Sequence, residues 1–384
     1  MQRLEHYVSA GGKRLRCGYT TGTCAAAAAG AATELLLAGT FVPSVVVSTP
    51  AGIEVAVDVE EAQRGDGWAL CAVRKDAGDD PDVTDGVMVY ARVQRIDGTE
   101  VRIDGGEGIG RVTKQGLDQP VGAAAINSVP RAMIGEAARA AAGRHGYEGG
   151  LAVTISIPEG TALAERTFNP RLGIEGGISV LGTSGIVRPM SEEALVASIA
   201  LELRVLRESG AQDLLLVPGN YGRDFATEVL GLSDARLVSC SNYLGAALDE
   251  AALLGFGSLL LVGHIGKLAK VAGGAMNTHS RVADGRMETL AAHAAMAGAT
   301  ARDVTALMGM PTTDAALDLL DRRGLLAATM ASMTERLGHH LSLRAAGHLQ
   351  VEAVVFSKQR GILGKTPGAD ELLIRHQAQV GEGR

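Results

Sequence analysis

The stretch Asp213-Leu-Leu-Leu-Val-Pro-Gly-Asn-Tyr-Gly222 places a short apolar run directly before a glycine- and asparagine-bearing loop, and helix-forming residues follow it. Three similar units surround it, each with a short apolar run, a glycine-bearing loop and a helical segment. Their runs are Ile178–Leu181, Arg236–Ser239 and Ser258–Val262. Short buried strands that alternate with helices are typical of a parallel sheet with helices on both faces. We therefore predict that residues 171–384 form an α/β domain with a Rossmann-like, doubly wound parallel sheet. Helical segments are expected over roughly residues 286–346, and the polar stretch Gly361–Arg384 is expected to be a loose tail.

Residues 1–170 carry a different pattern. The β-branched runs Ser44–Thr49 and Ile53–Val59 flank a Pro-Ala-Gly turn, and this arrangement predicts a β-hairpin. Further strands are expected at Trp68–Arg74, Gly86–Val93 and Leu151–Ile157, and helices at Ala25–Ala38 and Arg131–Gly143. This half is predicted to be an α+β domain with antiparallel strands. A chain of 384 residues is long for one hydrophobic core, which also favours two domains.

Charge and cysteine content exclude several classes of protein. The formal net charge of −7 argues against a nucleic-acid binder. No uninterrupted apolar run reaches the roughly 18–20 residues of a membrane-spanning helix, and the start of the chain lacks an apolar signal segment, so a cytoplasmic protein without a membrane partner is expected. The four cysteines form no CxxC pair and have no pair of histidines near them, so we expect reduced thiols and no protein-bound metal. A homo-oligomer remains possible.

The loops that follow parallel strands gather at one edge of a sheet, where such folds bind ligands. Small residues, exposed amides and asparagine side chains in these loops suit a nucleoside-type ligand with a polar tail. The expected ligand-binding residues are Gly182, Thr183, Ser184, Gly185, Gly219, Asn220, Tyr221, Ser241, Asn242 and Gly263. Any single loop is explained equally well by the ordinary end of a strand. No loop is a GxGxxG or Walker A sequence, so neither NAD nor ATP is favoured.

Two segments of the first half are candidates for binding anions. Thr20-Thr-Gly-Thr23 precedes the alanine-rich helix, where hydroxyls and free amides attract carboxylates or phosphates, although a plain helix cap explains it too. The glycine-rich stretch Gly105–Lys114 resembles a phosphate loop and keeps a small-molecule (GHMP-like) kinase as an alternative. The acidic stretch Asp76–Asp85 could bind a hard metal ion, but turn and cap chemistry also explains it, and its role stays open.

Taken together, these segments resemble the CbiD family over about residues 14–370. The matching stretches are Gly18–Cys24, Lys75–Thr84, Gly108–Lys114, Asn169–Gly177, Gly182–Met190, Gly219–Gly222 and Gly263–His279. The resemblance implies an S-adenosylmethionine (SAM)-dependent C-methyltransferase that methylates carbon 1 of cobalt-precorrin-5B in anaerobic cobalamin biosynthesis. It also implies that SAM is the methyl donor, that cobalt arrives with the corrinoid substrate, and that the glycine-rich SAM signature of common methyltransferases is absent.

A corrinoid with many acetate and propionate groups requires hydrogen-bond donors and basic side chains. The expected substrate-binding residues are Thr20, Thr21, Thr23, Arg111, Lys114, Arg171, Arg188 and Lys267. Glu175 and His264 are the candidate catalytic residues if a proton must be removed. We expect SAM over the loops of residues 171–384 and the macrocycle against Thr20–Thr23 and Gly105–Lys114. A non-catalytic tetrapyrrole-binding protein is a further alternative.

Overall fold

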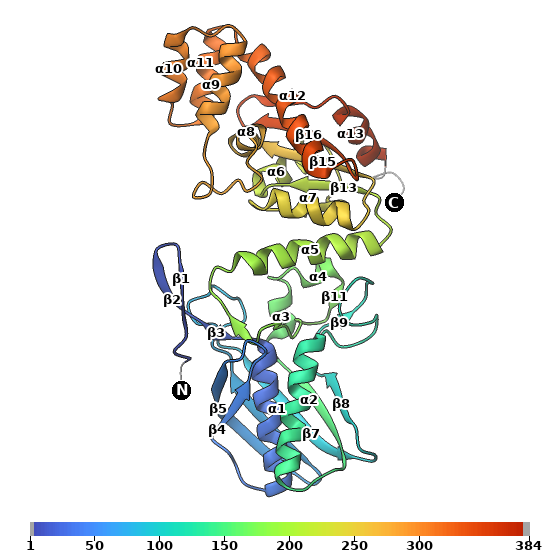
Figure 1. Ribbon diagram of the computed structural model, residues 1–384. Coiled ribbons are helices and arrows are strands. Elements are labelled where there is room, and N and C mark those ends of the chain that lie inside the picture. Colours follow the sequence, from blue (N-terminus) through green and yellow to red (C-terminus); the bar gives the residue numbers. More distant parts are fainter. Residues whose placement is uncertain (1–3, 379–384) are drawn as a thin grey trace. The chain divides into compact units, whose positions relative to one another are not determined.

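The computed structural model describes residues 4–378, which form two compact units, Met1–Glu192 and Glu193–Arg384 (Figure 1). The sequence placed this boundary between residues 170 and 171. Residues 171–192 instead belong to unit 1 because two of their short strands pair with strands of that unit. β11 (Ile174–Glu175) pairs with β9 (Arg111–Val112), and β12 (Ile186–Val187) pairs with β3 (Gly18–Tyr19).

Unit 1 is built on a six-stranded sheet with one layer of helices. In spatial order its strands are β4 (Ser44–Ser48), β5 (Glu54–Gly65), β6 (Trp68–Arg74), β7 (Met88–Ile96), β10 (Gly150–Ser156) and β8 (Val101–Gly105). All neighbours are antiparallel except β10 and β8. The predicted hairpin is confirmed as β4 and β5, with Ser44 opposite Asp58. Smaller elements are β1 (Tyr7–Ala10), β2 (Lys13–Arg16), α3 (Gly160–Ala164) and α4 (Asn169–Leu172).

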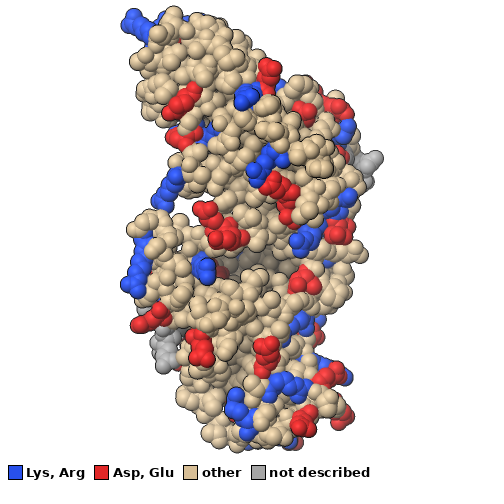
Figure 2. Space-filling model, in the orientation of Figure 1, with Lys and Arg blue, Asp and Glu red and all other residues tan. Residues whose placement is uncertain are grey.

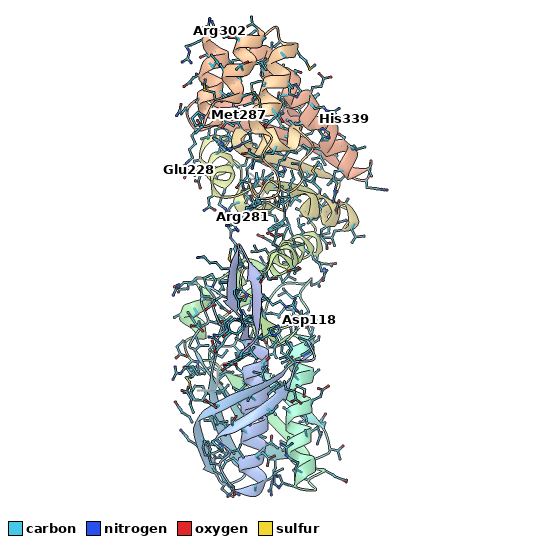
Figure 3. The ribbon with its side chains drawn as sticks, turned by 60° about the vertical axis from the view of Figure 1, so that its left-hand side comes forward. Asp118, Glu228, Arg281, Met287, Arg302 and His339 are labelled. Atoms are coloured by element: carbon cyan, nitrogen blue, oxygen red, sulfur yellow. The ribbon has the colours of Figure 1, made fainter. Side chains whose placement is uncertain are left out.

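Two helices, α1 (Thr21–Ala38) and α2 (Ser128–Arg144), lie side by side against this sheet (Figure 1). Small side chains permit the close approach, since Gly30 of α1 faces Ala137 of α2. Helix α1 is long and apolar enough to cross a membrane, but 83% of it is buried in the unit 1 core, which accounts for its composition. Asp118 accepts hydrogen bonds from Ser128 at the start of α2 and lies beside that helix end in Figure 3.

Unit 2 contains a five-stranded sheet. The spatial order is β14 (Leu237–Ser239), β13 (Asp213–Val217), β15 (Ser258–His264), β16 (Gln350–Ser357) and β17 (Gly361–Lys365). The first four strands are parallel and β17 is antiparallel to β16. Successive residues of β13 enter different cores: Leu214 packs in one apolar cluster and Leu215 in another. Both faces of the sheet are therefore buried, as the continuous apolar strands predicted.

Helices of unit 2 surround this sheet and continue beyond it, and the outer helices share its apolar core. The helices are α5 (Glu192–Glu208), α6 (Asn220–Asp224), α7 (Leu244–Leu253), α8 (Ile265–Ala272), α9 (Arg286–Met296), α10 (Ala301–Met308), α11 (Thr313–Arg322), α12 (Leu326–Ala345) and α13 (Ala369–Ala378), with a π-helical turn at Phe225–Val229 and a 3-10 turn at Asp234–Arg236. Helices α9, α10 and α11 gather at one end of α12 (Figure 1). The helices expected over residues 286–346 are confirmed.

Two sequence-based expectations about these elements are wrong. Ile178–Leu181 is not a strand of the unit 2 sheet, because Ile178 and Val180 form isolated parallel bridges with Ile109 and Ile126 in the unit 1 core. The polar stretch from Gly361, expected to be a loose tail, forms β17 and α13, and the apolar face of α13 packs on the sheet through Leu372. Residues 379–384 of that tail lie outside the described residues.

The buried histidines of unit 2 make its stability depend on pH. Burial lowers the pKa of His264, His293, His340 and His376 below the ordinary value near 6.5. As the pH falls through that value, the unfolded chain takes up protons before the folded chain does, so these groups destabilise the fold at low pH. We expect the free energy of unfolding to fall between pH 7.5 and 5.5, measured by denaturant titration. A free energy that stays constant or rises over this range would contradict the expectation, and a His376→Gln variant should show a weaker pH dependence.

Candidate functional site

Three loops meet at the carboxyl edge of the unit 2 sheet. Gly219 follows β13, Ser241 follows β14, and Lys267 lies in the first turn of α8 after β15. The Lys267 Nζ donates a hydrogen bond to the carbonyl oxygen of Ser241 at 3.0 Å. A Cβ atom at position 219 would lie 3.7 Å from the same Nζ. The structure therefore brings three of the four loops expected at this edge together around one ammonium group.

Two residues of these loops have backbone angles that are rare for residues with side chains. Gly219 has φ 110° and ψ −178°, a region that only glycine occupies readily. Ser241 has φ 51°, the left-handed conformation. Strained backbone of this kind concentrates at ligand-binding sites. Its presence in two neighbouring loops favours this edge as a ligand site.

The other residues expected at this edge have different roles. The Asn242 Oδ1 accepts a hydrogen bond from the Thr278 hydroxyl at 3.1 Å, and its carbonyl accepts one from the Thr278 amide at 2.9 Å, so Asn242 anchors the segment before α9. Gly263 is buried in β15, where a Cβ atom would lie 2.8 Å from the Leu268 side chain. Both serve packing. Asn220 and Tyr221 are exposed, and the Lys358 ammonium lies over the Tyr221 ring, 3.4 Å from its centroid.

His264 ends β15 and caps α8. Its Nδ1 accepts a hydrogen bond from the Gly266 amide at 3.1 Å, and burial lowers its pKa. An Nδ1 that accepts from an amide leaves the proton on Nε2 of the neutral ring. The ring packs edge-on against Phe356, with 5.5 Å between centroids. His264 is therefore arranged as a hydrogen-bond donor, which is a poor arrangement for the general base proposed from the sequence.

Four of the expected ligand-binding residues lie elsewhere. Gly182, Thr183, Ser184 and Gly185 belong to unit 1, where they pack against the start of α1. Their predicted place on the edge of the unit 2 sheet is wrong, because Ile178–Leu181 is not a strand of that sheet. A Cβ atom at Gly182 would lie 2.3 Å from the Thr20 hydroxyl oxygen, so this glycine permits a close contact between two segments that the sequence assigned to different domains.

The threonines at the start of α1 hold this loop. Thr20 accepts a hydrogen bond from the Thr23 amide, which confirms the predicted helix cap. The Thr21 hydroxyl donates to the Leu181 carbonyl at 3.2 Å and accepts from the Leu181 amide at 3.0 Å. The buried Thr23 hydroxyl donates to the Gly185 carbonyl at 2.7 Å. The hydroxyls expected to bind substrate carboxylates are thus engaged with backbone groups of the protein.

Replacing Thr21 by valine should loosen this attachment. The variant leaves the Leu181 amide without its partner, while the Leu181 carbonyl keeps its bond from the Gly22 amide, and an unsatisfied buried polar group costs about 1–3 kcal/mol. Hydrogen exchange of residues 181–185 should accelerate and the free energy of unfolding should fall. Thr33→Val is the matched control, because the Thr33 hydroxyl donates only to Ala29 within the same helix. Equal effects of the two substitutions would contradict a specific role for Thr21.

Most basic residues expected to bind substrate have partners within unit 1. Arg111 forms a bidentate pair with Asp104 at 2.8 and 3.1 Å, and the Lys114 Nζ donates to the Arg171 carbonyl at 3.0 Å. Arg188 is exposed and makes no hydrogen bond or ion pair with the residues that the structure describes. Glu175 is exposed, and its Oε1 accepts from the Thr113 hydroxyl at 3.3 Å.

The glycine-rich stretch is a packing element. The Gly106 amide donates to Ile155 at 2.8 Å and the Gly110 amide donates to Ile178 at 2.9 Å. A phosphate loop needs amides that point toward the ligand. Because these amides bond to the protein itself, the geometry does not support the kinase alternative.

The acidic stretch forms ion pairs and turns. Asp76 makes a bidentate pair with Arg16 at 2.7 Å, Asp82 pairs with the buried Lys75, and Asp80 accepts from the Met190 amide at 3.1 Å. Within residues 4–378, no group of three or more histidine, cysteine, aspartate or glutamate side chains is arranged to hold a metal ion. Turn chemistry therefore accounts for the contacts of this stretch. On the face that Figure 2 shows, acidic and basic side chains of both units are interspersed.

Comparison with known proteins decides the family. The family CbiD matches residues 8–189, and the family described as CbiD, C-terminal domain, matches residues 277–367. A cobalt-precorrin-5B C(1)-methyltransferase from Ruminiclostridium cellulolyticum is 48% identical over 354 residues, which are 92% of each chain. The chain belongs to the CbiD family. The resemblance stated from the sequence is thereby confirmed.

A second curated relative supports the assignment, and one solved structure is also similar. The enzyme of the same name from Alkaliphilus metalliredigens is 42% identical over 370 residues, covering 96% of this chain and 97% of its own. The crystal structure of a cobalamin biosynthesis protein (cbiD) from Archaeoglobus fulgidus is 30% identical, with a TM-score of 0.40, and covers 72% of this chain and 86% of that chain. Residues 190–276, which include Gly219, Ser241 and Lys267, lie between the two CbiD family matches.

Lys270 is a residue of this CbiD chain whose role was not foreseen. It is buried, and its Nζ donates to the Thr278 carbonyl at 3.0 Å, which fixes the segment that Asn242 also holds. The sequence feature that could have indicated this role is the position of Lys270, three residues after Lys267 on a helix that is otherwise apolar. Two lysines at this spacing share one face of a helix.

Proposed function

We propose that this chain transfers a methyl group from SAM to carbon 1 of cobalt-precorrin-5B in anaerobic cobalamin biosynthesis. The observation that carries the proposal is the similarity to cobalt-precorrin-5B C(1)-methyltransferases, 42–48% identical over more than nine-tenths of the chain. Each relative is covered to a similar extent, so the likeness concerns whole proteins.

We place SAM at the carboxyl edge of the unit 2 sheet. After β13 the chain first forms β14 on one side of it and then β15 on the other side. The direction of strand addition therefore reverses between β13 and β15, which is a topological switch point. Open parallel sheets bind ligands outside the carboxyl ends of their strands at such points, which supports a Rossmann-like interpretation of unit 2. The glycine at 219, the exposed Tyr221 ring and the Lys267 ammonium suit a ligand made of a nucleoside and an amino acid.

We assign recognition of the corrinoid to unit 1. Its acetate and propionate groups need basic partners, and arginine binds carboxylates in a fork. Arg188 supports this assignment because it is exposed and unpaired among the described residues, while Arg111 is exposed but must exchange Asp104 for a ligand carboxylate. In this proposal the protein chiefly holds and orients the two substrates, since direct attack of an electron-rich ring carbon on the sulfonium methyl group requires no strong base.

We further propose that the protein acts in the cytoplasm. All four cysteines are buried free thiols, which suits a reducing compartment.

Ligand-dependent stabilisation tests the choice of methyl donor. A ligand that binds only the folded protein stabilises it by about 2.7 kcal/mol at a concentration of 100 Kd. SAM and S-adenosylhomocysteine should therefore raise the thermal midpoint of the full-length protein, while ATP and NAD should leave it unchanged. Stabilisation by ATP alone would overturn the proposal in favour of a kinase.

A further inference from the structure

The ammonium group of Lys267 carries a charge that the protein does not neutralise. The side chain is half-buried, and its one hydrogen bond is to the Ser241 carbonyl. It forms no ion pair with any carboxylate of residues 4–378. Two of the three ammonium protons are therefore left for another acceptor. A desolvated cation without a counter-ion is unfavourable unless a ligand supplies one.

The neighbours of Lys267 do not supply the missing charge. Burial raises the pKa of the Cys240 thiol to about 12, so Cys240 stays neutral at physiological pH. Burial lowers the pKa of Lys267, and the second positive charge of the nearby Lys270 lowers it further. Lys270 itself points to the Thr278 carbonyl. The positive charge of Lys267 thus has no negative partner among its neighbours, which favours a bound anion.

The position of this cation is well defined. The backbone at Gly219 lies close to Nζ, and the Ser241 carbonyl fixes the ammonium from the opposite loop. Both loops follow strands that are hydrogen-bonded neighbours in the sheet. Because Lys267 follows β15 and its ammonium reaches these two loops, the charge lies over the carboxyl end of β13, beside the switch point between β13 and β15, where a ligand of this sheet is expected.

We infer that Lys267 binds the carboxylate of the methionine part of SAM and so selects a donor that carries an amino-acid end. This inference rests on the proposed function. A carboxylate can come from two sources here, the methyl donor or the acetate and propionate groups of the corrinoid. The donor fits better, because the Lys267 ammonium lies against Gly219 and Ser241, which are assigned to the nucleoside site. The assignment replaces the substrate role that the sequence suggested for Lys267.

A carboxylate at Lys267 also orients the donor. The sulfonium sulfur of SAM is positive, so a lysine that holds the carboxylate end keeps the sulfonium at the distance set by the methionine chain. The adenosine end then extends along the same edge toward the exposed Tyr221, whose ring lies 3.4 Å from the Lys358 ammonium. S-adenosylhomocysteine carries the same carboxylate, whereas 5′-methylthioadenosine lacks the amino-acid end altogether. The difference between the affinities of these two compounds therefore measures the contribution of the amino-acid end, which includes the proposed contact with Lys267.

The test compares the affinities of these two compounds for the full-length protein and for Lys267→Met, by isothermal titration calorimetry. The wild-type protein should bind S-adenosylhomocysteine more tightly than 5′-methylthioadenosine. In Lys267→Met the ratio of the two affinities should fall about tenfold. The affinity for 5′-methylthioadenosine should stay unchanged, which also shows that the variant is folded. Lys267→Arg should retain most of the preference. Lys365→Met is the matched control, because Lys365 pairs with Asp370 elsewhere in unit 2 and should leave both affinities unchanged.

Each other outcome overturns the inference in a distinguishable way. An unchanged preference in Lys267→Met, or an equal loss of both compounds, means that Lys267 does not bind the donor carboxylate. Weaker binding of cobyrinic acid with an unchanged preference assigns Lys267 to the corrinoid. If the wild-type protein binds neither nucleoside, the proposed SAM site fails, and the assignment of Lys267 fails with it.

Discussion

Replacing Gly108 by alanine is expected to destabilise unit 1 by about 4 kcal/mol, the sum of backbone strain and overpacking. Gly108 has φ 74°, and a Cβ atom there would lie 1.7 Å from the carbonyl oxygen of Ile157. The clash is with backbone, which cannot rotate away as a side chain can. Three segments that meet here would have to separate, since Gly108 also contacts Gly160 and Gly177.

Gly122→Ala separates the two causes. Gly122 has φ 89° in an exposed turn of the same unit, and a Cβ atom there would meet nothing within 4 Å. This variant should cost only about 1 kcal/mol, from the left-handed backbone. Denaturant unfolding of both variants measures the difference. Equal losses would show that the close approach at Gly108 contributes nothing and that backbone strain alone explains the effect.

Gly219→Ala is expected to weaken SAM binding about 10–100-fold, because a side chain in this region of backbone space costs about 1–3 kcal/mol. The loop can relieve the strain only by changing its angles, φ 110° and ψ −178°. That change moves the loop that faces the Lys267 ammonium. The proposed donor site therefore loses its shape although no polar group is removed. Isothermal titration with SAM measures the loss.

Gly231→Ala is the control for Gly219→Ala. Gly231 has φ 65°, lies in the same unit and would place its Cβ in open space. It should reduce stability slightly and leave SAM affinity unchanged. If both variants bind SAM like the wild type, or if both lose affinity equally, the carboxyl edge of the unit 2 sheet is not the donor site.

Much of the fold could be predicted because local patterns agree with it. The strand Asp213–Val217 has the predicted bounds, since a continuous apolar run followed by proline and glycine admits few other structures. Ile178–Leu181 has the same local pattern but bridges to Ile109 and Ile126. Nothing within the segment distinguishes these two environments, because the difference lies in residues about 50–70 positions away. The domain boundary was misplaced for the same reason.

The candidate site was predicted in part. Loops after successive parallel strands must share an edge, so the meeting of Gly219, Ser241 and Lys267 follows from topology once the strands are recognised. Contacts between side chains and distant backbone could not be predicted. The bonds from Thr21 to Leu181 and from Thr23 to Gly185 join positions about 160 residues apart, and they turn an expected anion site into an internal attachment.

The most direct test of the central claim is methyl transfer itself. The full-length protein should be incubated with cobalt-precorrin-5B and SAM that carries a labelled methyl group, and the corrinoid product analysed by mass spectrometry and nuclear magnetic resonance. We expect the product to gain one methyl group, with the label at carbon 1 and one S-adenosylhomocysteine formed for each product. A protein that binds the corrinoid but transfers no label from SAM would contradict the claim and favour a tetrapyrrole-binding protein instead.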